Sequence, residues 1–282
     1  MYHPALKPRN KALITGGLSG IGLAATRRFA AMGLYIEIID NKAGQAEAII
    51  EELCEVGRNA GHSGGFVSVN EMDVSDPAEW QAHANRPLSI PDVLMNNAAI
   101  GPDSSVLDAA NWQATLDTNL WGVIHGTQAL AQAMVASGKP GLIINTGSKQ
   151  GITTPPGNPA YNVSKAGVKV FTEALQHELR NGPNPAVTAH LLIPGFVWTG
   201  MTSRGKVEKP DAAWTPEQTI QFLLDSLARG DFYILCPDND VQRSLDEKRM
   251  AWAAGDIIDN RPPLSRWHPD YAEAFKAFVD QG

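Results

Sequence analysis

Residues 11–22 read KALITGGLSGIG, and this stretch decides the fold. An apolar strand candidate at 11–15 leads into a glycine-rich turn, and a helical pattern then continues to Gly33. Such a turn lets the backbone approach a pyrophosphate closely, and the helix that follows supplies unpaired N–H groups and the positive end of a dipole. Glycines alone fit an ordinary turn. Strand, turn and helix together predict a dinucleotide-binding turn.

Six further apolar runs repeat this alternation of strand and helix. Each run is short and rich in branched residues, and amphipathic patterns fill most of the gaps, as in a parallel sheet with crossover helices. We therefore predict a single α/β domain of the doubly wound Rossmann type, with a seven-stranded parallel sheet flanked by helices. The predicted strands are Lys11–Thr15, Leu34–Asp40, Gly65–Met72, Asp92–Asn96, Gly141–Thr146, Ala186–Ile193 and Phe232–Leu235.

Local signals mark where two of the helices begin and end. Asp76 followed by Pro77 is typical of an N-cap with proline at the first helical position. Thr215 and Gln218 form a capping box before an apolar stripe, and Gly230 then ends the predicted helix.

Composition and charge exclude several classes of partner. The chain has 282 residues, of which 43% are hydrophobic, and 23 basic against 30 acidic residues give a net charge of −7. The absence of a basic patch argues against nucleic acid and against an anionic membrane. The polar start at Met1–Lys11 contains neither a secretory signal nor a spanning helix, so we predict a cytoplasmic protein.

Cysteine and histidine spacing predicts no metal site. Cys54 and Cys236 have no C-x-x-C partner, and the seven histidines never pair at H-x-x-x-H spacing. Neither a zinc site nor a disulfide framework is therefore predicted. We interpret both cysteines as buried free thiols.

An acidic residue at the end of the second predicted strand concerns the choice of cofactor. Asp40 lies 18 residues after Gly22, where a doubly wound fold presents a side chain to the adenosine ribose. A carboxylate there accepts hydrogen bonds from the ribose hydroxyls and repels a 2′-phosphate, and no arginine follows it to offset that charge. The sequence therefore predicts NAD rather than NADP, unless Asp40 is only a solvated acid.

A tyrosine and a lysine four residues apart form the candidate catalytic pair. The spacing of Tyr161 and Lys165 places both side chains on one face of a predicted helix. A phenol has an ordinary pKa of about 10, which a nearby ammonium lowers by favouring the phenolate. Such pairs are common on helix surfaces. However, Ser148 follows a predicted parallel strand at the edge where open α/β sheets bind ligands, and its hydroxyl can hold the same substrate oxygen.

Together these motifs resemble the compact branch of the short-chain dehydrogenase/reductase family over residues 10–236. The resemblance depends on several motifs that occur in one order. It departs from the common pattern in two places, where Asn-Asn-Ala-Gly is replaced by Asn-Asn-Ala-Ala and where the serine stands in Thr146-Gly147-Ser148. The motifs are Thr15-Gly16-x-x-x-Gly20-Ile21-Gly22, Asp73, Asn96-Asn97-Ala98-Ala99, Asn119, Ser148, Tyr161-x-x-x-Lys165 and Pro194-Gly195.

The resemblance implies an NAD-dependent oxidoreductase that transfers a hydride between NAD(H) and a secondary alcohol or ketone. It implies that Tyr161 is the catalytic acid/base and that Ser148 orients the substrate oxygen. Lys165 would tune Tyr161 and bind the nicotinamide ribose, and Asn119 would anchor a water that links Lys165 to solvent.

The resemblance also implies a cofactor site along the ends of the strands. Asp73 and the adjacent Val74 would contact the adenine, and the loop containing Val197 and Thr199 would hold the carboxamide. The full cofactor set is Gly16, Leu18, Ser19, Gly20, Ile21, Gly22, Asp40, Asp73, Val74, Asn97, Ala98, Ala99, Tyr161, Lys165, Pro194, Gly195, Val197 and Thr199.

The substrate is a small molecule whose identity the sequence leaves open. Large side chains in the loop after the nicotinamide segment suggest an apolar or aromatic wall, although the same side chains could pack the loop down. Basic residues in that loop leave an acidic group possible. The predicted substrate contacts are Ser148, Gln150, Tyr161, Phe196 and Trp198.

The last 46 residues, 237–282, extend beyond the predicted catalytic domain at 1–236. A helix is predicted over Val241–Ala254, and Pro262-Pro263 interrupts the pattern. Several large aromatic residues in this extension need burial. We therefore expect the extension to pack on the domain, over the substrate cleft, or on a neighbouring subunit of a homodimer or homotetramer.

Two other functions use part of the same pattern. Nucleotide-sugar epimerases and dehydratases share the Tyr-x-x-x-Lys pair, but they usually space their glycines as Gly-x-x-Gly-x-x-Gly and add a larger C-terminal domain. A protein that only senses NAD(H) would keep the fold without needing the Ser148, Tyr161 and Lys165 set.

Overall fold

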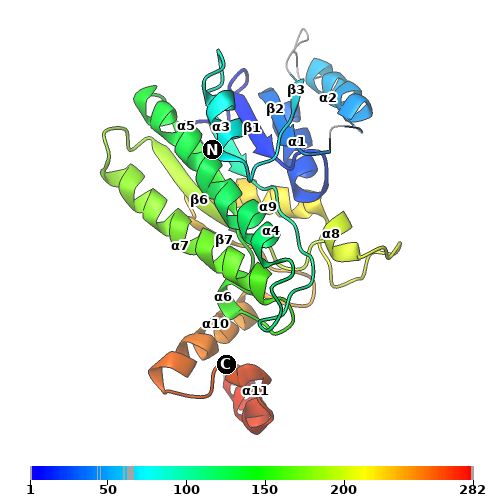
Figure 1. Ribbon diagram of the computed structural model, residues 1–282, viewed down its shortest axis with the longest axis vertical. Helices are drawn as coiled ribbons and strands as arrows, with labels where there is room; N and C mark the ends of the chain where they lie inside the picture. The colour runs from blue at the N-terminus through cyan, green and yellow to red at the C-terminus, as the bar shows by residue number, and fades with distance from the viewer. Residues whose placement is uncertain (1, 43, 45, 60, 62–66, 281–282) are drawn as a thin grey trace.

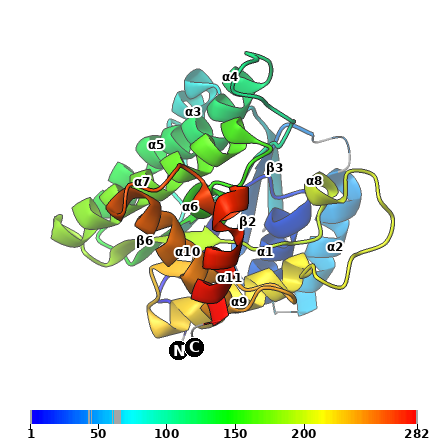
Figure 2. The ribbon, with the colours of Figure 1, turned by 90° about the horizontal axis from the view of Figure 1, so that it is seen from below.

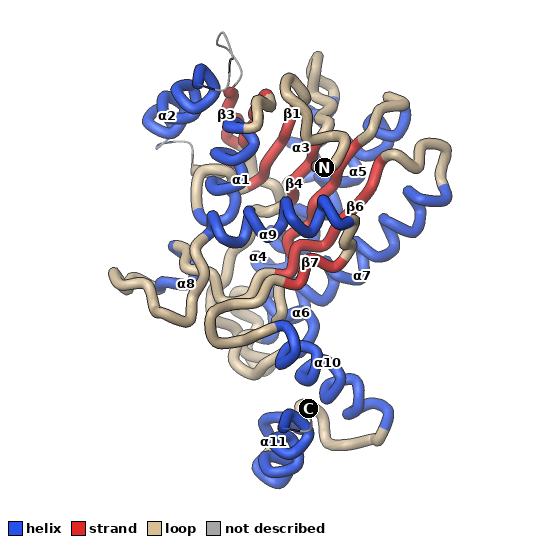
Figure 3. Tube along the Cα trace, turned by 180° about the vertical axis from the view of Figure 1, so that it is seen from behind, coloured by secondary structure: helices blue, strands red, loops and turns tan. Residues whose placement is uncertain are grey.

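The computed structural model describes residues 2–42, 44, 46–59, 61 and 67–280. Its centre is one sheet of seven parallel strands in the order β3-β2-β1-β4-β5-β6-β7 (Figure 3). The order reverses between β1 and β4, and doubly wound folds bind ligands at this switch point. The strands are β1 (Lys11–Thr15), β2 (Tyr35–Asp40), β3 (Val67–Glu71), β4 (Val93–Asn96), β5 (Gly141–Thr146), β6 (Val187–Ile193) and β7 (Tyr233–Leu235).

The predicted fold class is confirmed, with all seven strands in their predicted places. Four strands begin one residue later than expected, and β3 ends one residue earlier. The first two residues predicted for β3, 65 and 66, lie outside the described residues.

Helices cover both faces of the sheet (Figure 1). Alternation along β1 explains why both faces are apolar: Ala12 and Ile14 pack in the core with Phe29, while Leu13 packs in the opposite core with Trp80. Within the described ranges, no helix combines the length and the apolar character that a membrane span requires. One face carries α1 (Gly20–Ala31), α2 (Ala46–Asn59) and α9 (Pro216–Arg229), and the other carries α3 (Pro77–Ala84), α4 (Trp112–Leu116), α5 (Gly122–Ala136) and α7 (Pro159–Asn181).

The predicted helix ends are also present. Asp76 caps α3 by accepting a hydrogen bond from the backbone N–H of Ala78 at 2.7 Å. Thr215 and Gln218 form the capping box of α9, and Gly230 ends that helix with φ 81°. Three short pieces lie among the loops, namely the π-helical turn η2 (Asp117–Trp121), α6 (Gln150–Thr153) and α8 (Gly200–Ser203).

The C-terminal extension projects from the end of the molecule at which α6 lies (Figures 1 and 2). Its first helix, α10 (Arg243–Ile258), begins two residues later than predicted and continues four residues further. α10 contacts α6, while α11 contacts α10 and the two short turns that precede it. The rest of the extension comprises η3 (Ser265–Trp267), η4 (Pro269–Tyr271) and α11 (Ala272–Asp280).

Candidate active site

The catalytic candidates meet at the carboxyl ends of the central strands. Ser148 follows β5, and α7 presents Tyr161 and Lys165 one turn apart. Asn158 caps α7, because its Oδ1 accepts a hydrogen bond from the N–H of Tyr161 at 3.4 Å, and proline occupies the first turn. Ser148, Tyr161 and Lys165 line one cavity of about 790 Å³.

Burial is the main influence on the ionisation of the catalytic pair. It lowers the pKa of Lys165 to about 8 and raises the pKa of Tyr161, while a hydrogen bond with Ser148 opposes the rise at Tyr161. The Nζ of Lys165 donates to the carbonyl oxygen of Thr146 at 2.8 Å and lies 5.7 Å from the centre of the Tyr161 ring. The net effect on Tyr161 is therefore opposite to the one predicted from the sequence, because desolvation of the phenolate outweighs the hydrogen bond with Ser148.

The Asn119 side chain joins two segments of the site. Its Oδ1 accepts a hydrogen bond from the N–H of Ile100 at 2.8 Å, and its Nδ2 donates to the Ile100 oxygen at 2.9 Å and to the Ser164 hydroxyl at 3.3 Å. Asn119 is fully buried on η2, and such π-helical turns are frequent at functional sites. The side chain thus holds the loop after β4 against α7, and its role in carrying a water stays a prediction.

The turn between β1 and α1 has the shape of a phosphate cradle. Gly16 has φ +64°, and a Cβ there would lie 2.9 Å from the Cα of Ala98. At Gly22 a Cβ would lie 2.1 Å from the carbonyl oxygen of Gly16. A bare backbone beside a helix N-terminus suits the pyrophosphate of a dinucleotide. Gly16, Ser19, Gly20 and Ile21 line the cavity, whereas Leu18 is part of the hydrophobic core.

The segment after β4 packs directly against this turn. The Thr15 hydroxyl accepts hydrogen bonds from the N–H groups of Asn97 at 2.8 Å and Ala98 at 3.0 Å. The Nδ2 of Asn97 also donates to the Thr15 carbonyl at 3.2 Å. Asn97, Ala98 and Ala99 all line the cavity, so these bonds fix one of its walls.

Asp40 ends β2 beside the glycine-rich turn. Its Oδ2 accepts a hydrogen bond from the N–H of Leu18 at 3.3 Å, and its Oδ1 accepts one from the N–H of Lys42 at 3.1 Å. Lys42, to which the sequence analysis gave no role, lines the cavity. A cation in this wall would attract a 2′-phosphate, which acts against a preference for NAD over NADP.

Asp73 and Val74 follow β3, where the resemblance places an adenine contact. The Oδ1 of Asp73 accepts hydrogen bonds from the N–H and the hydroxyl of Ser75 at 2.9 and 2.8 Å. Val74 is buried, and a Cβ added at Gly122 would lie 2.8 Å from its side chain. Among the described residues that line the cavity, neither Asp73 nor Val74 occurs. Their contact with adenine stays a prediction.

The loop after β6 forms the opposite wall. Val197 pairs with Trp214 in an isolated bridge, and Thr199 caps α8. A Cβ added at Gly20 would lie 3.1 Å from the Thr199 methyl group, so this loop closely approaches the glycine-rich turn. Pro194, Gly195, Val197 and Thr199 all line the cavity.

A second hollow of about 470 Å³ opens beside Ser148 and Tyr161. Gln150 and Phe196 line it, where a substrate contact was predicted. Trp198 instead lines a separate hollow between α1 and α9. The backbone N–H of Trp198 donates to the backbone oxygen of Trp214 at 2.8 Å, and this bond holds the loop in this position. The structure therefore does not bring Trp198 to the predicted substrate wall.

The second hollow also includes Asn158, for which no role was predicted, and Met201, one of the large side chains of the loop after β6. Asn158 had a readable signal, because an Asn before a proline is a helix N-cap and it stands three residues before Tyr161. Met201 belongs to the loop whose large side chains predicted an apolar or aromatic wall. It reaches the hollow through the path of the loop after β6, and a Cβ at Gly101 would lie 3.3 Å from its sulfur.

Both cysteines are free, and Cys236 is buried, which raises the pKa of its thiol to about 12. Cys54 is half-buried. Across the part of the chain that the structure describes, no three His, Cys, Asp or Glu side chains gather as a metal ion would require.

Comparison with known proteins identifies relatives over most of the chain. A family model described as short chain dehydrogenase matches residues 10–209. The chain is also 33% identical over 250 residues to a sulfoacetaldehyde reductase from Chromohalobacter salexigens, across 86% of this chain and 95% of that protein.

Solved structures share the fold. A short chain dehydrogenase/reductase from Burkholderia phymatum in complex with NAD has a TM-score of 0.76 and 27% identity, over 93% of this chain and 98% of that one. An alcohol dehydrogenase from the archaeon Thermococcus sibiricus, complexed with 5-hydroxy-NADP, has a TM-score of 0.67 and 23% identity over 78% and 91%, a likeness of fold alone. NAD and an NADP derivative therefore both occur among the neighbours. Because the family model matches well over half of this chain, the chain belongs to the short-chain dehydrogenase family.

Proposed function

We propose that this protein transfers a hydride between NAD(H) and a secondary alcohol or ketone. The family and relatives such as a hydroxysteroid dehydrogenase and a galactitol 2-dehydrogenase support an oxidoreductase that acts on a CH–OH group. The observation that carries the proposal is that Ser148, Tyr161 and Lys165 line the same cavity as the glycine-rich turn. Oxidation of a CH–OH group removes a proton and a hydride from adjacent atoms, so it needs a proton acceptor beside a cofactor site.

The residues of the chain divide the proton chemistry among them. Bound NAD(H) would supply or accept the hydride at its nicotinamide. Tyr161 takes the proton of the substrate hydroxyl when the alcohol is oxidised and returns it when the carbonyl is reduced. Ser148, already hydrogen-bonded to Tyr161, holds the same oxygen. Lys165 favours the phenolate form of Tyr161 and so opposes the effect of burial.

NAD is the proposed cofactor because of the charge beside the glycine-rich turn. Two backbone N–H groups hold the carboxylate of Asp40 there, where it would repel a 2′-phosphate. Lys42 acts in the opposite direction, so we expect a preference for NAD that is not absolute.

The second hollow supports a substrate with an apolar or aromatic part. Phe196 and Met201 provide apolar surface and Gln150 provides an amide group, whereas the amide of Asn158 is engaged in capping α7 and in a bond to Pro102. This mixture of apolar walls and a few polar groups is typical of small-molecule sites. Arg204, at the same hollow, is paired with Asp103 at 2.9 Å on the exposed surface.

The test combines a substrate panel with isotope labelling. The purified protein is assayed for oxidation of NADH and of NADPH with ketones that carry aliphatic or aromatic groups, and the products formed from deuterated NADH are analysed by mass spectrometry. We expect deuterium on the carbinol carbon of the product and a higher kcat/KM for NADH. Binding of NADH without turnover of any ketone would instead indicate a sensor, and turnover of nucleotide sugars without net oxidation of NADH would indicate an epimerase.

A further inference from the structure

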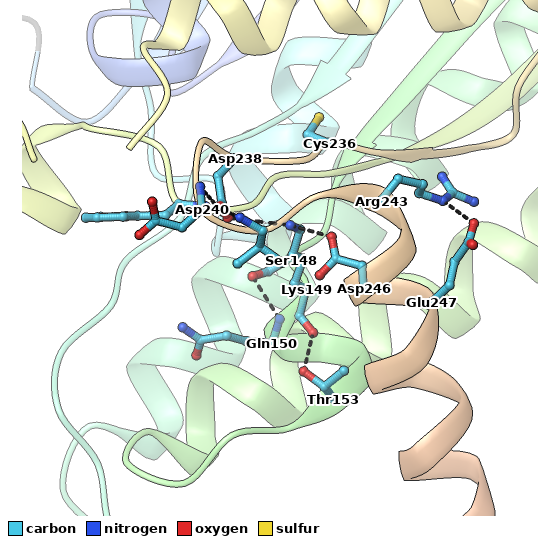
Figure 4. A network of polar contacts seen from close by, with 12 residues as sticks. Ser148, Lys149, Gln150, Thr153, Cys236, Asp238, Asp240, Arg243, Asp246 and Glu247 are labelled. Carbon is cyan, nitrogen blue, oxygen red and sulfur yellow. Dashed lines mark hydrogen bonds and ion pairs between the residues drawn. The ribbon is translucent and has the colours of Figure 1, made fainter. Parts of the chain in front are cut away.

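Lys149 follows Ser148 and is held in a buried cluster of charges (Figure 4). Its Nζ lies 2.5 Å from the Oδ2 of Asp246 and 3.5 Å from the Oδ2 of Asp238. The side chains of Lys149, Asp238 and Asp246 are only 16%, 7% and 6% exposed. Two carboxylates neutralise this ammonium from within the protein, so its charge is not available to a substrate anion.

The cluster joins the C-terminal extension to the catalytic body. Asp246 lies in the first turn of α10, and α10 contacts α6. On the same helix, Met250 packs against the hydrophobic core beside β6 and α7. The elements that follow it, η3, η4 and α11, contact α10 and one another.

On the body side, the backbone of Lys149 is joined to Ser148 and to α6. Its carbonyl oxygen accepts hydrogen bonds from the N–H and the hydroxyl of Thr153 at 3.1 and 3.3 Å. In α6, Gly151 lies so close to α7 that a Cβ there would be 2.5 Å from the carbonyl carbon of Lys165. A shift of Lys149 would therefore move Ser148 and disturb the helix turn that carries Lys165.

Asp238 connects the same cluster to the loop after β6. Its Oδ2 accepts a hydrogen bond from the N–H of Phe196 at 3.2 Å. A Cβ at Gly195 would lie 2.7 Å from that Oδ2 and 2.9 Å from the Nζ of Lys149. The cluster therefore lies directly against the loop that lines both hollows.

We propose that Lys149, held between Asp238 and Asp246, is a positioning residue through which the C-terminal extension sets the geometry of Ser148 and of the loop at Gly195–Phe196. The proposal rests on the proposed function for its effect on turnover. Under this proposal α10 influences the active site from outside it, because none of the described residues of α10 lines either hollow.

The test compares two carboxylates that are adjacent on α10. Asp246→Asn removes the charge that faces Lys149, and Glu247→Gln removes an exposed one that pairs with Arg243 at 2.7 Å. We expect Asp246→Asn to lower kcat at least tenfold, because a misplacement of reacting groups by about 1 Å can cost about 10²-fold. Glu247→Gln should leave kcat unchanged. Lys149→Gln should resemble Asp246→Asn, and the double variant should be no worse than the poorer single variant, because both changes break one contact.

Hydrogen–deuterium exchange provides a readout that needs no turnover. Asp246→Asn should speed exchange in peptides covering residues 147–154 and 195–198, while Glu247→Gln should not. Unchanged exchange in those peptides would overturn the proposal, as would a loss of thermal stability with unchanged kcat. Gly195→Ala perturbs the cluster from the other side and should raise exchange at 147–154 as well. A wild type that turns over no alcohol or ketone would overturn the proposed function alone, because the exchange result would still decide the positioning role.

Discussion

The cleft and the C-terminal extension both bury polar groups, but they support them differently. Beneath the cleft formed by the two hollows, Asn96 Nδ2 donates to the Asn145 side-chain oxygen at 2.9 Å, and Asn145 Nδ2 donates to the Thr172 hydroxyl at 3.0 Å. These bonds join residues that are 49 and 27 positions apart, across two strands and α7. In the extension, the indole N–H of Trp252 donates to the Ser265 hydroxyl at 2.8 Å, only 13 positions away.

This difference indicates how each region should respond to damage. The cleft is built on a sheet buried on both faces, so its geometry persists until the whole domain unfolds. The extension surrounds a single buried indole, with Arg261 4.1 Å from the Trp252 ring and two phenylalanine rings 5.3 Å away. Regions with few buried contacts open independently of the rest of a protein. A change in the cleft should therefore affect chemistry alone, and a change at Trp252 should affect the extension first.

The largest effect is expected at the catalytic end of this comparison. Tyr161→Phe should lower kcat by about 10²–10⁴-fold, because general acid–base catalysis contributes this much. NADH binding, followed by fluorescence titration, and exchange in α10 should not change. The matched control is Tyr233→Phe, which removes a hydroxyl that bonds to Glu173 on the surface. Wild-type turnover in Tyr161→Phe would remove Tyr161 from the mechanism.

The next largest effect is expected in the extension. Trp252→Ala should cost about 3–5 kcal/mol of local stability, as removal of a buried Trp side chain does. Hydrogen exchange should then become fast over residues 243–280 and stay slow in the strands. Trp267→Ala is the control, because Trp267 is 39% exposed in the same region. Light scattering on both variants also tests the predicted homodimer or homotetramer. If exchange in Trp252→Ala became fast in the strands as well as in residues 243–280, the extension and the cleft would unfold as one unit, and the two regions would not be separable.

The parts of the molecule that local rules govern could be predicted from the sequence. The strands of the sheet are short apolar runs because both faces are buried, and Asp76 and Thr215 cap helices because their side chains reach backbone N–H groups two or three residues away. The same reasoning brought Ser148, Tyr161 and Lys165 to one edge of the sheet. Only their order along the chain and the topology were needed for that placement.

Features that depend on long-range packing could not be predicted. The pairing of Lys149 with Asp246 joins residues on α10 and beside β5, and no local pattern marks it. Trp198 faces α1 and α9 because of its bond to Trp214, and that bond depends on the path of the whole loop. The pKa of Tyr161 rises rather than falls, because the direction of the shift depends on how deeply the phenol is buried.

A pH-dependent effect of intermediate size sharpens the contrast further. Burial lowers the pKa of Lys165 from 10.5 to about 8 in the folded protein. Between these values the unfolded chain binds a proton that the folded chain does not, so the stability of the wild type relative to Lys165→Met should rise with pH by about 3 kcal/mol. Urea unfolding of both proteins from pH 7 to 10.5 measures this difference.

The matched control for that measurement lies one turn further along α7. Lys169 pairs with Glu173 at 2.8 Å and is 33% exposed, so Lys169→Met should show no comparable rise. At each pH, hydrogen exchange in α10 of both variants should match that of the wild type. If the difference in unfolding free energy between the wild type and Lys165→Met did not change with pH, the ammonium of Lys165 would be solvated. The cleft would then be more accessible to water than the core of the extension.

The smallest effect is expected at the cofactor end of the cleft, far from the extension. Asp40→Asn keeps an oxygen that can accept the hydrogen bond from Leu18 but removes the charge that would repel a 2′-phosphate. The ratio of kcat/KM for NADH to that for NADPH should fall about tenfold, about 1.4 kcal/mol, a size expected for one charge near a protein surface. Lys42→Met should raise the ratio, because it removes the opposing charge, and Asp73→Asn should affect both coenzymes equally. If the choice of coenzyme depends only on the cleft, the Trp252→Ala variant should give the same ratios of kcat/KM for NADH and NADPH. A changed ratio in that variant would show that the extension also influences the cofactor end of the cleft, beyond its contact with Lys149.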